Sequence, residues 1–240
     1  MNQPAPKTSP AISFDDIRTL VKNDLPALQN IVAPPALLDD MGVVWAWLAS
    51  SQGREKPLLR HPRLALFATP AAQAAIENLR GGKHPLNPLA EEANADLQVY
   101  ELGSKNTSPD DNEIAHALAY GMMAVQPGID LLVVAALDAG AEKAGDETAL
   151  RLNSAEPLAA IKTLDIAAMT GALIAARLAK TPVLLEGKAA LAAAAVLEKL
   201  KDGASDHAKD VAAIPFARTA LPLPCRAAML VPFLKTLTKI

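Results

Sequence analysis

The N-terminal part of the chain has two stretches with the helical spacing of apolar residues. From Phe14 to Asn30 apolar residues recur at steps of three and four, and Ser13 stands where a helix N-cap is expected. After a break at Pro34 and Pro35, the same spacing returns from Leu37 to Ser51. Each stretch places its apolar side chains on one helix face, so we expect two helices that pack together.

Beyond Arg60 the pattern changes to short apolar runs that alternate with helical stretches. The runs that predict strands are Arg63–Ala68, Leu97–Leu102, Asp130–Ala136, Pro182–Leu185 and the less regular Val211–Phe216. The helical stretches between them are Pro70–Leu79, Pro88–Ala95, Asn112–Val125, Pro157–Lys180 and Ala189–Lys201. This alternation predicts an α/β fold with a Rossmann-like parallel sheet and helices on both faces. Loops that follow the strands then share one sheet edge, where a ligand crevice is expected.

The segment Ala227–Leu237 predicts a closing helix that returns to the N-terminal helices. We therefore expect a disordered leader over residues 1–12, and a small helical subdomain that begins with the N-terminal helices over 13–58. A Rossmann-like α/β domain is expected over 59–220, followed over 221–240 by the C-terminal helix of the small subdomain.

Composition and charge narrow the choice of partners and compartment. The 23 Lys and Arg residues against 26 Asp and Glu give a net charge of -3, which offers no basic stripe for nucleic acid. Charged residues interrupt every apolar stretch before the roughly twenty residues that a membrane helix needs. The single cysteine, Cys225, fits a reducing compartment, and the N-terminus lacks the apolar core of a secretory signal. We expect a cytoplasmic protein with neither a nucleic-acid nor a membrane partner.

Few residues stand in patterns that carry chemistry. Gly187 and Lys188 follow an apolar run, as in a phosphate-binding loop, but no upstream glycine and no following Ser or Thr complete that motif. The four histidines lack the spacing of metal ligands, so neither a metal site nor a cofactor is expected. Cys225 has no base partner in the sequence and is better explained as a buried thiol.

Two carboxylates have both a functional and a structural explanation. Glu186 ends an apolar run at the edge where ligands bind, and it is either a pocket residue or a partner for the N-terminus of the next helix. Asp165 stands inside a predicted helix, where a hydrogen bond to a neighbouring turn is the simpler explanation.

A family resemblance rests on the segment from Thr163 to Arg177 and the one from Pro182 to Gly187. The first reads Thr-Leu-Asp-Ile-Ala-Ala-Met-Thr-Gly-Ala-Leu-Ile-Ala-Ala-Arg, and the second reads Pro-Val-Leu-Leu-Glu-Gly. They resemble a helix and the strand Pro-Val-Leu-Leu-Asp-Gly of the nicotinate-nucleotide:dimethylbenzimidazole phosphoribosyltransferase (CobT-like) family. The segments Pro34–Ala49, Leu86–Val99 and Ala227–Pro232 resemble other family segments in the same order. The likeness covers residues 25–240 of a chain that is shorter than a typical member.

The resemblance implies a Rossmann-like sheet, a helical subdomain from both chain ends, and a homodimer. Active family members transfer the phosphoribosyl group of nicotinate mononucleotide to a benzimidazole nitrogen, which makes the nucleotide-loop precursor of cobalamin. A glutamate takes the proton of that nitrogen, and glycine-rich loops receive the phosphate.

This sequence departs from the family at three loops, which include the one that carries the family's catalytic glutamate. The family's Phe-Ala-Gly-Asp-His-Gly is replaced by Phe67–Ala72, which reads Phe-Ala-Thr-Pro-Ala-Ala. Its Gly-Glu-Met-Gly-Ile-Gly-Asn-Thr-Thr is replaced by Ala135–Lys143, which keeps only Gly140 and gains Asp138 and Glu142. Its Gly-Glu-Gly-Thr-Gly becomes Pro222–Arg226, so that Leu223 stands at the position of the catalytic base. Leucine cannot accept a proton, and acidic side chains repel a phosphate.

Two hypotheses follow. In the first, the chain is a divergent, non-catalytic member that keeps a dimer, binds a small aromatic base or a nucleotide, or pairs with an active paralogue. In the second, it is an active phosphoribosyltransferase with a relocated base, for which Glu186 is the candidate. The expected pocket residues are Thr69, Ala136, Asp138, Gly140, Glu186, Gly187 and Lys188.

Overall fold

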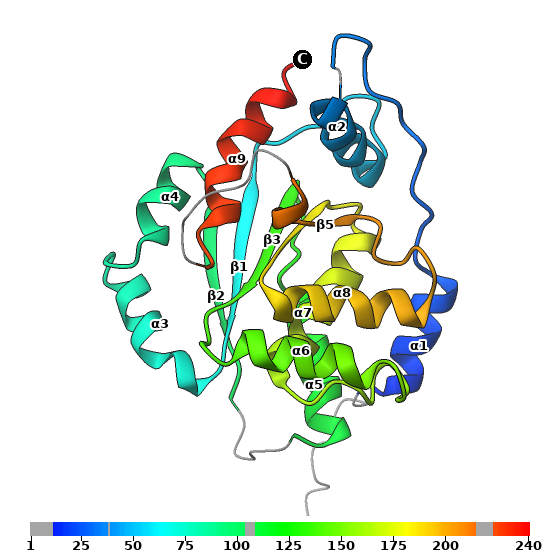
Figure 1. Ribbon diagram of the computed structural model, residues 1–240, viewed down its shortest axis with the longest axis vertical. Coiled ribbons are helices and arrows are strands. Elements are labelled where there is room, and N and C mark those ends of the chain that lie inside the picture. The colour runs from blue at the N-terminus through cyan, green and yellow to red at the C-terminus, as the bar shows by residue number, and fades with distance from the viewer. Residues whose placement is uncertain (1–11, 38, 104–108, 215–222) are drawn as a thin grey trace, which may run out of the picture.

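The computed structural model describes residues 12–37, 39–103, 109–214 and 223–240, and it contains a parallel five-stranded sheet (Figure 1). The strands are β1 (Pro62–Ala68), β2 (Asp96–Glu101), β3 (Leu131–Ala136), β4 (Val183–Glu186) and β5 (Ala208–Asp210). They lie in the order β2-β1-β3-β4-β5, and all neighbouring pairs are parallel. From β1 the chain first adds β2 on one side. It then crosses to the other side of β1 and adds β3, β4 and β5 in turn. The predicted α/β fold is confirmed.

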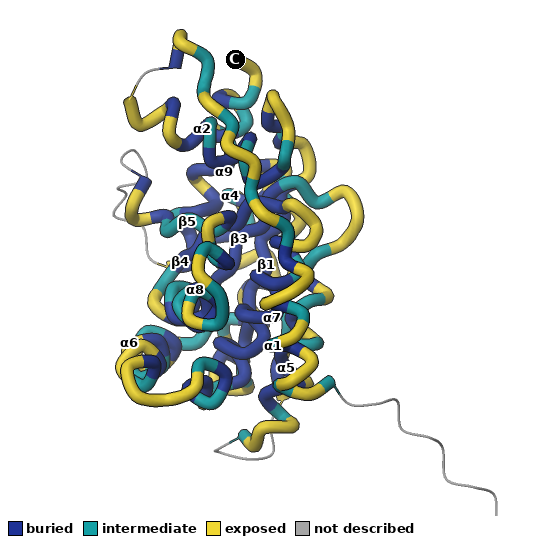
Figure 2. The backbone as a smooth tube through the Cα atoms, turned by 90° about the vertical axis from the view of Figure 1, so that its right-hand side faces the viewer, coloured by how far each residue is buried: buried dark blue, intermediate teal, exposed yellow. Residues whose placement is uncertain are grey.

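Helices cover both faces of the sheet. One face carries α1 (Phe14–Asn23), α5 (Asp111–Met122), α6 (Ala141–Arg151), α7 (Leu164–Leu178) and α8 (Lys188–Leu200). The other carries α2 (Asp39–Gln52), α3 (Gln73–Arg80), α4 (Leu86–Glu92) and α9 (Arg226–Leu237). Short 3-10 turns, η1 (Pro70–Ala72) and η2 (Val211–Ala213), follow β1 and β5. Figure 2 shows β1, β3, β4 and α7 buried between these layers, with α6 at the exposed rim.

The alternation of side chains along the strands explains why apolar runs predicted the sheet. In β1, Ala65 and Phe67 join the hydrophobic cluster beneath α5, α7 and α8, whereas Leu64 and Leu66 join the cluster beneath α2, α4 and α9. Successive side chains of a strand point to opposite faces, and here both faces are covered. A continuous apolar run such as β1 therefore belongs in the interior of a doubly covered sheet.

Helices α5 and α7 approach each other closely because glycine lies at both contacts. A Cβ atom on Gly171 of α7 would lie 1.9 Å from the carbonyl oxygen of Leu118, and one on Gly121 of α5 would lie 1.8 Å from that of Ala168. Since neither distance leaves room for a methyl group, the two backbones are separated only by hydrogen atoms. Small residues such as these glycines allow helices to pack this closely.

The two N-terminal helices do not pack together, contrary to the expectation from their periodicity. The buried residues of α1, Ile17 and Val21, belong to the cluster with α7 and α8, whereas Trp45 and Leu48 of α2 belong to the cluster on the opposite face. The first helix ends at Asn23 rather than Asn30, and residues 25–34 have no regular structure. This extended connection carries the chain from one face of the sheet to the other (Figure 1).

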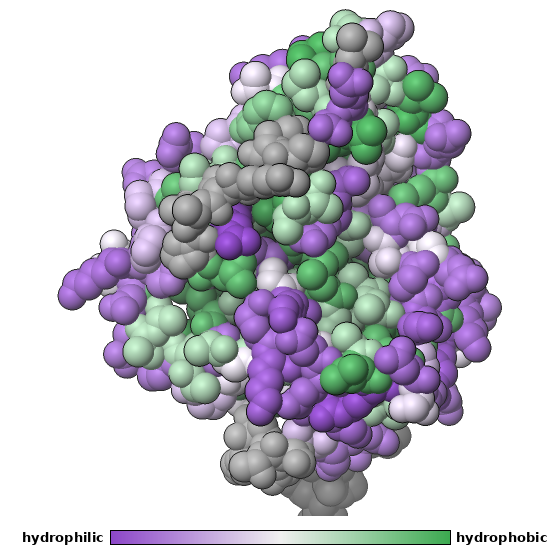
Figure 3. Space-filling model, in the orientation of Figure 1, coloured by the Kyte–Doolittle hydropathy of each residue, from purple (hydrophilic) through white to green (hydrophobic). Residues whose placement is uncertain are grey.

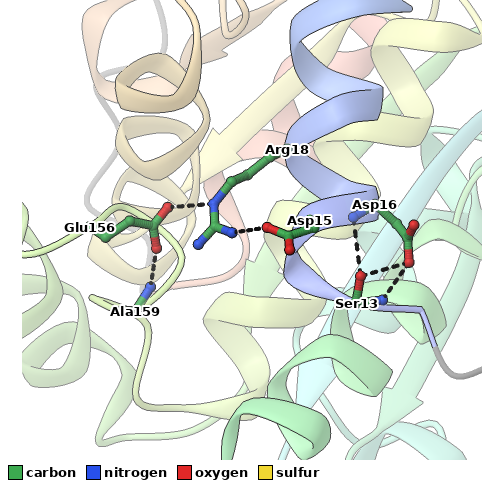
Figure 4. A network of polar contacts seen from close by, with 6 residues as sticks. All are labelled: Ser13, Asp15, Asp16, Arg18, Glu156 and Ala159. Atoms are coloured by element: carbon green, nitrogen blue, oxygen red, sulfur yellow. Dashed lines mark hydrogen bonds and ion pairs between the residues drawn. The ribbon is translucent and has the colours of Figure 1, made fainter.

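Polar contacts fix α1 in this position (Figure 4). The Ser13 and Asp16 side chains form a capping box, in which each accepts a hydrogen bond from the other's backbone N–H. Arg18 donates from Nε to Glu156 at 3.1 Å and pairs through Nη1 with Asp15. The second oxygen of Glu156 accepts the N–H of Ala159, so α1 is tied to the segment that precedes α7.

Three other element predictions need correction. The weak run Val211–Phe216 is not a strand: β5 ends at Asp210, whose side chain caps η2 by accepting the N–H of Ala212 at 2.8 Å. Residues 215 and 216 lie outside the described residues, as do residues 1–11 of the expected leader and residues 221–222 of the expected C-terminal segment.

Helix α7 begins at Leu164 rather than Pro157, and helix α6 was not predicted. The expected domain boundaries stay a prediction. No helix within the described ranges has the length and hydropathy of a membrane span.

Candidate functional site

The candidate site lies at the carboxyl ends of the strands, where the strand order reverses between β1 and β3. This position is the expected ligand crevice of an open parallel sheet. Thr69 directly follows β1, and Asp138 follows β3 by two residues. Asp138 accepts the backbone N–H of Thr69 at 2.8 Å through Oδ2 and the Thr69 hydroxyl at 3.0 Å through Oδ1. The carboxylate of Asp138 therefore bridges the crevice and occupies the N–H that a bound anion would use.

A second carboxylate occupies the N-terminus of α8. Glu142, in the first turn of α6, accepts the backbone N–H of Lys188 at 2.8 Å. Gly187 before it has a φ of 89°, and a Cβ there would lie 2.7 Å from Oε1 of Glu142. The Lys188 ammonium pairs with Asp146 of α6 at 2.7 Å. The features that resemble a phosphate-binding loop are thus engaged by acidic side chains of α6, over which Figure 3 shows hydrophilic surface.

Glu186, the last residue of β4, caps a helix that is distant in sequence. Its side chain is 3% exposed, and its Oε1 and Oε2 accept the N–H groups of Arg226 and Ala227 at 2.8 and 3.0 Å. These are the first two residues of α9, so Glu186 interacts with the N-terminus of α9 rather than with the next helix, α8. Burial raises the pKa of Glu186, and the two N–H donors oppose that rise.

Leu223 lies beside these groups at the rim of the site. Its side chain is 38% exposed, and its Cδ1 would lie 3.6 Å from a Cβ built on Gly187. Cys225, two residues later, is 1% exposed, and burial together with the nearby charge of Glu186 raises the pKa of its thiol. A buried thiol of this kind is a poor nucleophile, which favours the structural explanation of Cys225.

The structure brings most of the predicted pocket residues to one edge of the sheet. Ala136 is half-buried at the end of β3, and Gly140 precedes α6 at the surface. Glu142 was not among the predicted pocket residues, although it contacts Gly187 and Lys188. A signal for it existed in the sequence, because an acidic residue in the first turn of a helix after β3 faces the same edge.

Asp165 accepts a hydrogen bond within its own turn of the helix rather than from the neighbouring turn that was expected. Its Oδ1 accepts the N–H of Ile166 at 2.9 Å within the first turn of α7, and its side chain is 3% exposed. Burial raises the pKa of Asp165, and the negative charge of Asp138 adds to that effect. Within the described ranges, no three His, Cys, Asp or Glu side chains are placed to share a metal ion.

Comparisons with known proteins identify the family. A family model described as Phosphoribosyltransferase matches residues 133–211, which run from β3 to η2. The chain is 28% identical to the nicotinate-nucleotide–dimethylbenzimidazole phosphoribosyltransferase of Rhizobium etli, over 82% of this chain and 79% of that protein. The Brucella abortus protein of the same name is 26% identical over the same shares. These matches support a CobT-like family member.

Solved structures show that this CobT-like chain shares the fold of its relatives. Crystal structures of CobT and of nicotinate-nucleotide-dimethylbenzimidazole phosphoribosyltransferase, both from Thermus thermophilus, each superpose with a TM-score of 0.70. The first is 18% identical and covers 93% of this chain and 95% of that chain, and the second is 19% identical and covers 97% and 96%. The sheet and helices of this chain therefore share the fold of these crystal structures, while its carboxyl edge has the contacts described above.

Proposed function

We propose that this CobT-like chain does not carry out phosphoribosyl transfer and instead binds a small molecule or a protein partner. The observation that carries the proposal is the occupation of backbone N–H donors at the candidate site. Thr69 and Lys188 donate to Asp138 and Glu142, and Arg226 and Ala227 donate to Glu186. A phosphate at this edge needs such donors and would also meet the negative charge of the carboxylates.

The position that the resemblance assigns to the catalytic base supports the same conclusion. Leu223 stands there, and its hydrocarbon side chain has no proton acceptor. The loss of a general base alone lowers a reaction rate by about 10²- to 10⁴-fold. Together with the occupied N–H donors, this loss leaves the site without either group that the reaction requires.

The second candidate function is transfer with Glu186 as a relocated base. Burial raises the pKa of Glu186, which would favour proton abstraction near neutral pH. However, each of its oxygens already accepts an N–H from α9, and its side chain is 3% exposed. Glu186 could reach a substrate only if the N-terminus of α9 moved, so we rank this function second.

The proposal is tested by turnover. Purified protein is incubated with nicotinate mononucleotide and dimethylbenzimidazole, and free nicotinate is measured by chromatography. We expect no release above the rate without protein. Release that Glu186→Gln abolishes and the exposed control Glu92→Gln preserves would establish the second function and overturn the first. Circular dichroism of both variants checks that each is folded.

The proposed binding role makes separate claims about the ligand, the oligomeric state and the cellular compartment. Calorimetry with dimethylbenzimidazole, nicotinate and nucleotides tests whether a small aromatic base or a nucleotide binds. Light scattering tests the homodimer, and co-purification with an active paralogue tests the heterodimer. We place the protein in the cytoplasm. A monomer that binds none of these ligands and no paralogue would refute the binding role.

A further inference from the structure

A second cavity lies at the opposite edge of the sheet, at the amino ends of β1, β3 and β4. It has a volume of about 470 Å³. Its walls come from the C-terminal ends of α2 and α7, from the segment that leads into β1, and from the turn before β3. We call it the amino-edge pocket and define it by Gln52, Arg54, Arg60, His61, Asp130 and Lys180. It shares no lining residue with the candidate site.

The charge of the amino-edge pocket is positive although the chain as a whole is acidic. Arg54, Arg60 and Lys180 line the pocket, are exposed, and take part in none of the ion pairs found in the described part of the chain. His61 adds an imidazole to the lining. A chain with a net charge of -3 thus places three cationic side chains around one cavity.

Among the described residues that line the amino-edge pocket, the one carboxylate, Asp130, is held by the backbone. Asp130 accepts the N–H of Arg60 at 2.5 Å and the N–H of His61 at 2.9 and 3.0 Å. Both oxygens of Asp130 therefore face the segment that leads into β1. The guanidinium and ammonium groups of the pocket are left to bind a ligand.

The wall of the amino-edge pocket is fixed by Gln52, whose side chain is 8% exposed. Its Nε2 donates to the carbonyls of Leu58 and Asp130 at 2.6 and 2.9 Å, and its Oε1 accepts the N–H of Leu58 at 2.8 Å. These bonds join the end of α2 to the segments that precede β1 and β3. Fixed walls lower the entropic cost of binding a ligand.

The backbone of Lys180 supports a binding role for its side chain. Lys180 has a φ of 56°, in the left-handed region where glycine or asparagine is the usual residue after a helix. Its Cδ would lie 3.6 Å from a Cβ on Gly53, so the Lys180 side chain runs beside the end of α2. Cations at helix C-termini complement the helix dipole, which explains Arg54 and Lys180 in part. Arg60 and His61 lie in the segment before β1, where that explanation does not apply.

We propose that the amino-edge pocket binds a small phosphorylated molecule that carries at least two negative charges. The cavity volume falls within the range of small-molecule sites, and guanidinium groups bind phosphate oxygens in a bidentate manner. Three cations spread around the cavity suit a diphosphate better than a single carboxylate. The proposal does not depend on the function proposed for the carboxyl edge.

The test is calorimetric titration of the full chain with inorganic pyrophosphate and with ADP at constant ionic strength. We expect both to bind, and Arg60→Gln and Lys180→Gly each to weaken binding by about 10- to 100-fold, the usual effect of losing one charge-assisted bond. Lys180→Gly should fold well, because glycine is relaxed at a positive φ. The matched control Lys199→Gln, which removes one exposed charge from α8, should bind as the wild type does.

Three results would overturn the proposal. The first is that neither pyrophosphate nor ADP binds at millimolar concentration. The second is binding that Arg60→Gln and Lys180→Gly leave unchanged. The third is binding that Lys199→Gln weakens as much as they do, which would indicate attraction to net charge alone. Asp138→Gly, at the opposite sheet edge, separates this proposal from the function proposed above, because it should leave the amino-edge pocket unaffected.

Discussion

Removal of Asp138 and Glu142, the two carboxylates that accept backbone N–H groups after β1 and β4, should allow phosphate to bind at the carboxyl edge of the sheet. The double variant Asp138→Gly/Glu142→Thr brings back the residues that the family resemblance assigns to these positions. It frees the N–H groups of Thr69 and Lys188, which now donate to Asp138 and Glu142 at 2.8 Å each. A phosphate beside either N–H group could then accept it without displacing a charged partner.

The size of the effect follows from the bonds that are replaced. A hydrogen bond to a charged group contributes about 1.5–3 kcal/mol, so the part-buried bond from Thr69 to Asp138 opposes an incoming phosphate by about that amount. The bond from Lys188 to Glu142 is exposed, and solvent makes its contribution smaller. The sum corresponds to a factor of about 10 to 10² in the dissociation constant. We expect nicotinate mononucleotide to bind the double variant more tightly than the wild type by about this factor, and Asp138→Gly alone to give an intermediate value.

Amide resonances of Thr69 and Lys188 provide a local readout that binding at the amino-edge pocket does not disturb. Titration with nicotinate mononucleotide should shift both resonances in the double variant and neither in the wild type. Nicotinate release should remain absent, because Leu223 still occupies the base position. If the double variant is folded and its two amides do not respond at millimolar ligand, the carboxylates are not what closes the site, and the reasoning fails.

Two further predictions concern stability. Gly171→Ala should lower the free energy of unfolding, measured by urea denaturation, by about 1–3 kcal/mol, because the added methyl would lie 1.9 Å from the carbonyl oxygen of Leu118. Ala172→Gly, which cannot clash, is the comparison. An unchanged free energy of unfolding in Gly171→Ala would refute the close contact. His207 is buried, and burial lowers its pKa to about 3, so the folded state stays neutral at pH values where the unfolded state binds a proton. Stability should therefore fall as the pH drops from about 6.5 toward 3, by up to about 1.4 kcal/mol per pH unit. His207→Gln should lack this component, and equal pH slopes for the wild type and the variant would contradict it.

The sheet was predictable because its inner strands are covered on both faces. Residues 64–67 of β1 and 132–135 of β3 are almost wholly buried, and the sequence shows this as continuous apolar runs. β5 spans only Ala208–Asp210, all half-buried, so the sequence has no such run there. The neighbouring Val211 and Ile214 are buried under η2 rather than in a strand, which explains the misplaced prediction.

Helix α6 was not predicted, because its sequence lacks an apolar face and has a glycine, Gly145, in its middle. Its residues are mostly charged or small, because it lies at the rim and packs on α8 rather than directly on the sheet. Gly145 in its middle argues against a helix by propensity. In the structure, a Cβ at Gly145 would lie 2.4 Å from the backbone of Lys188, so glycine is required for α6 to approach α8. This tertiary requirement cannot be seen in the local sequence.

The site was predictable as a place but not as a set of contacts. The rule that loops after parallel strands share one edge placed Thr69, Asp138, Gly187 and Lys188 after the carboxyl ends of their strands, where the structure has them. Their pairing depends on residues far apart in the chain: Thr69 and Asp138 are separated by 69 positions, and Glu142 and Lys188 by 46. Glu186 was assigned to the following helix as one alternative, but its partners lie 40 and 41 positions further on, in α9.

The contacts of Asp138 and Glu142 also stabilise the fold, and under the proposed function this explains how phosphate-binding loops could be replaced without loss of the structure. A buried backbone N–H without an acceptor costs about 1–3 kcal/mol, and the half-buried N–H of Thr69 after β1 would bear part of that cost, whereas water can serve the exposed N–H of Lys188 after β4. Asp138 and Glu142 supply acceptors for them within the chain. With these acceptors the folded protein does not need a bound phosphate to satisfy its N–H groups. The same contacts weaken the binding of a phosphate, because it would have to displace them. A variant that regains the ligand should therefore be less stable without it, and added ligand should restore its unfolding temperature.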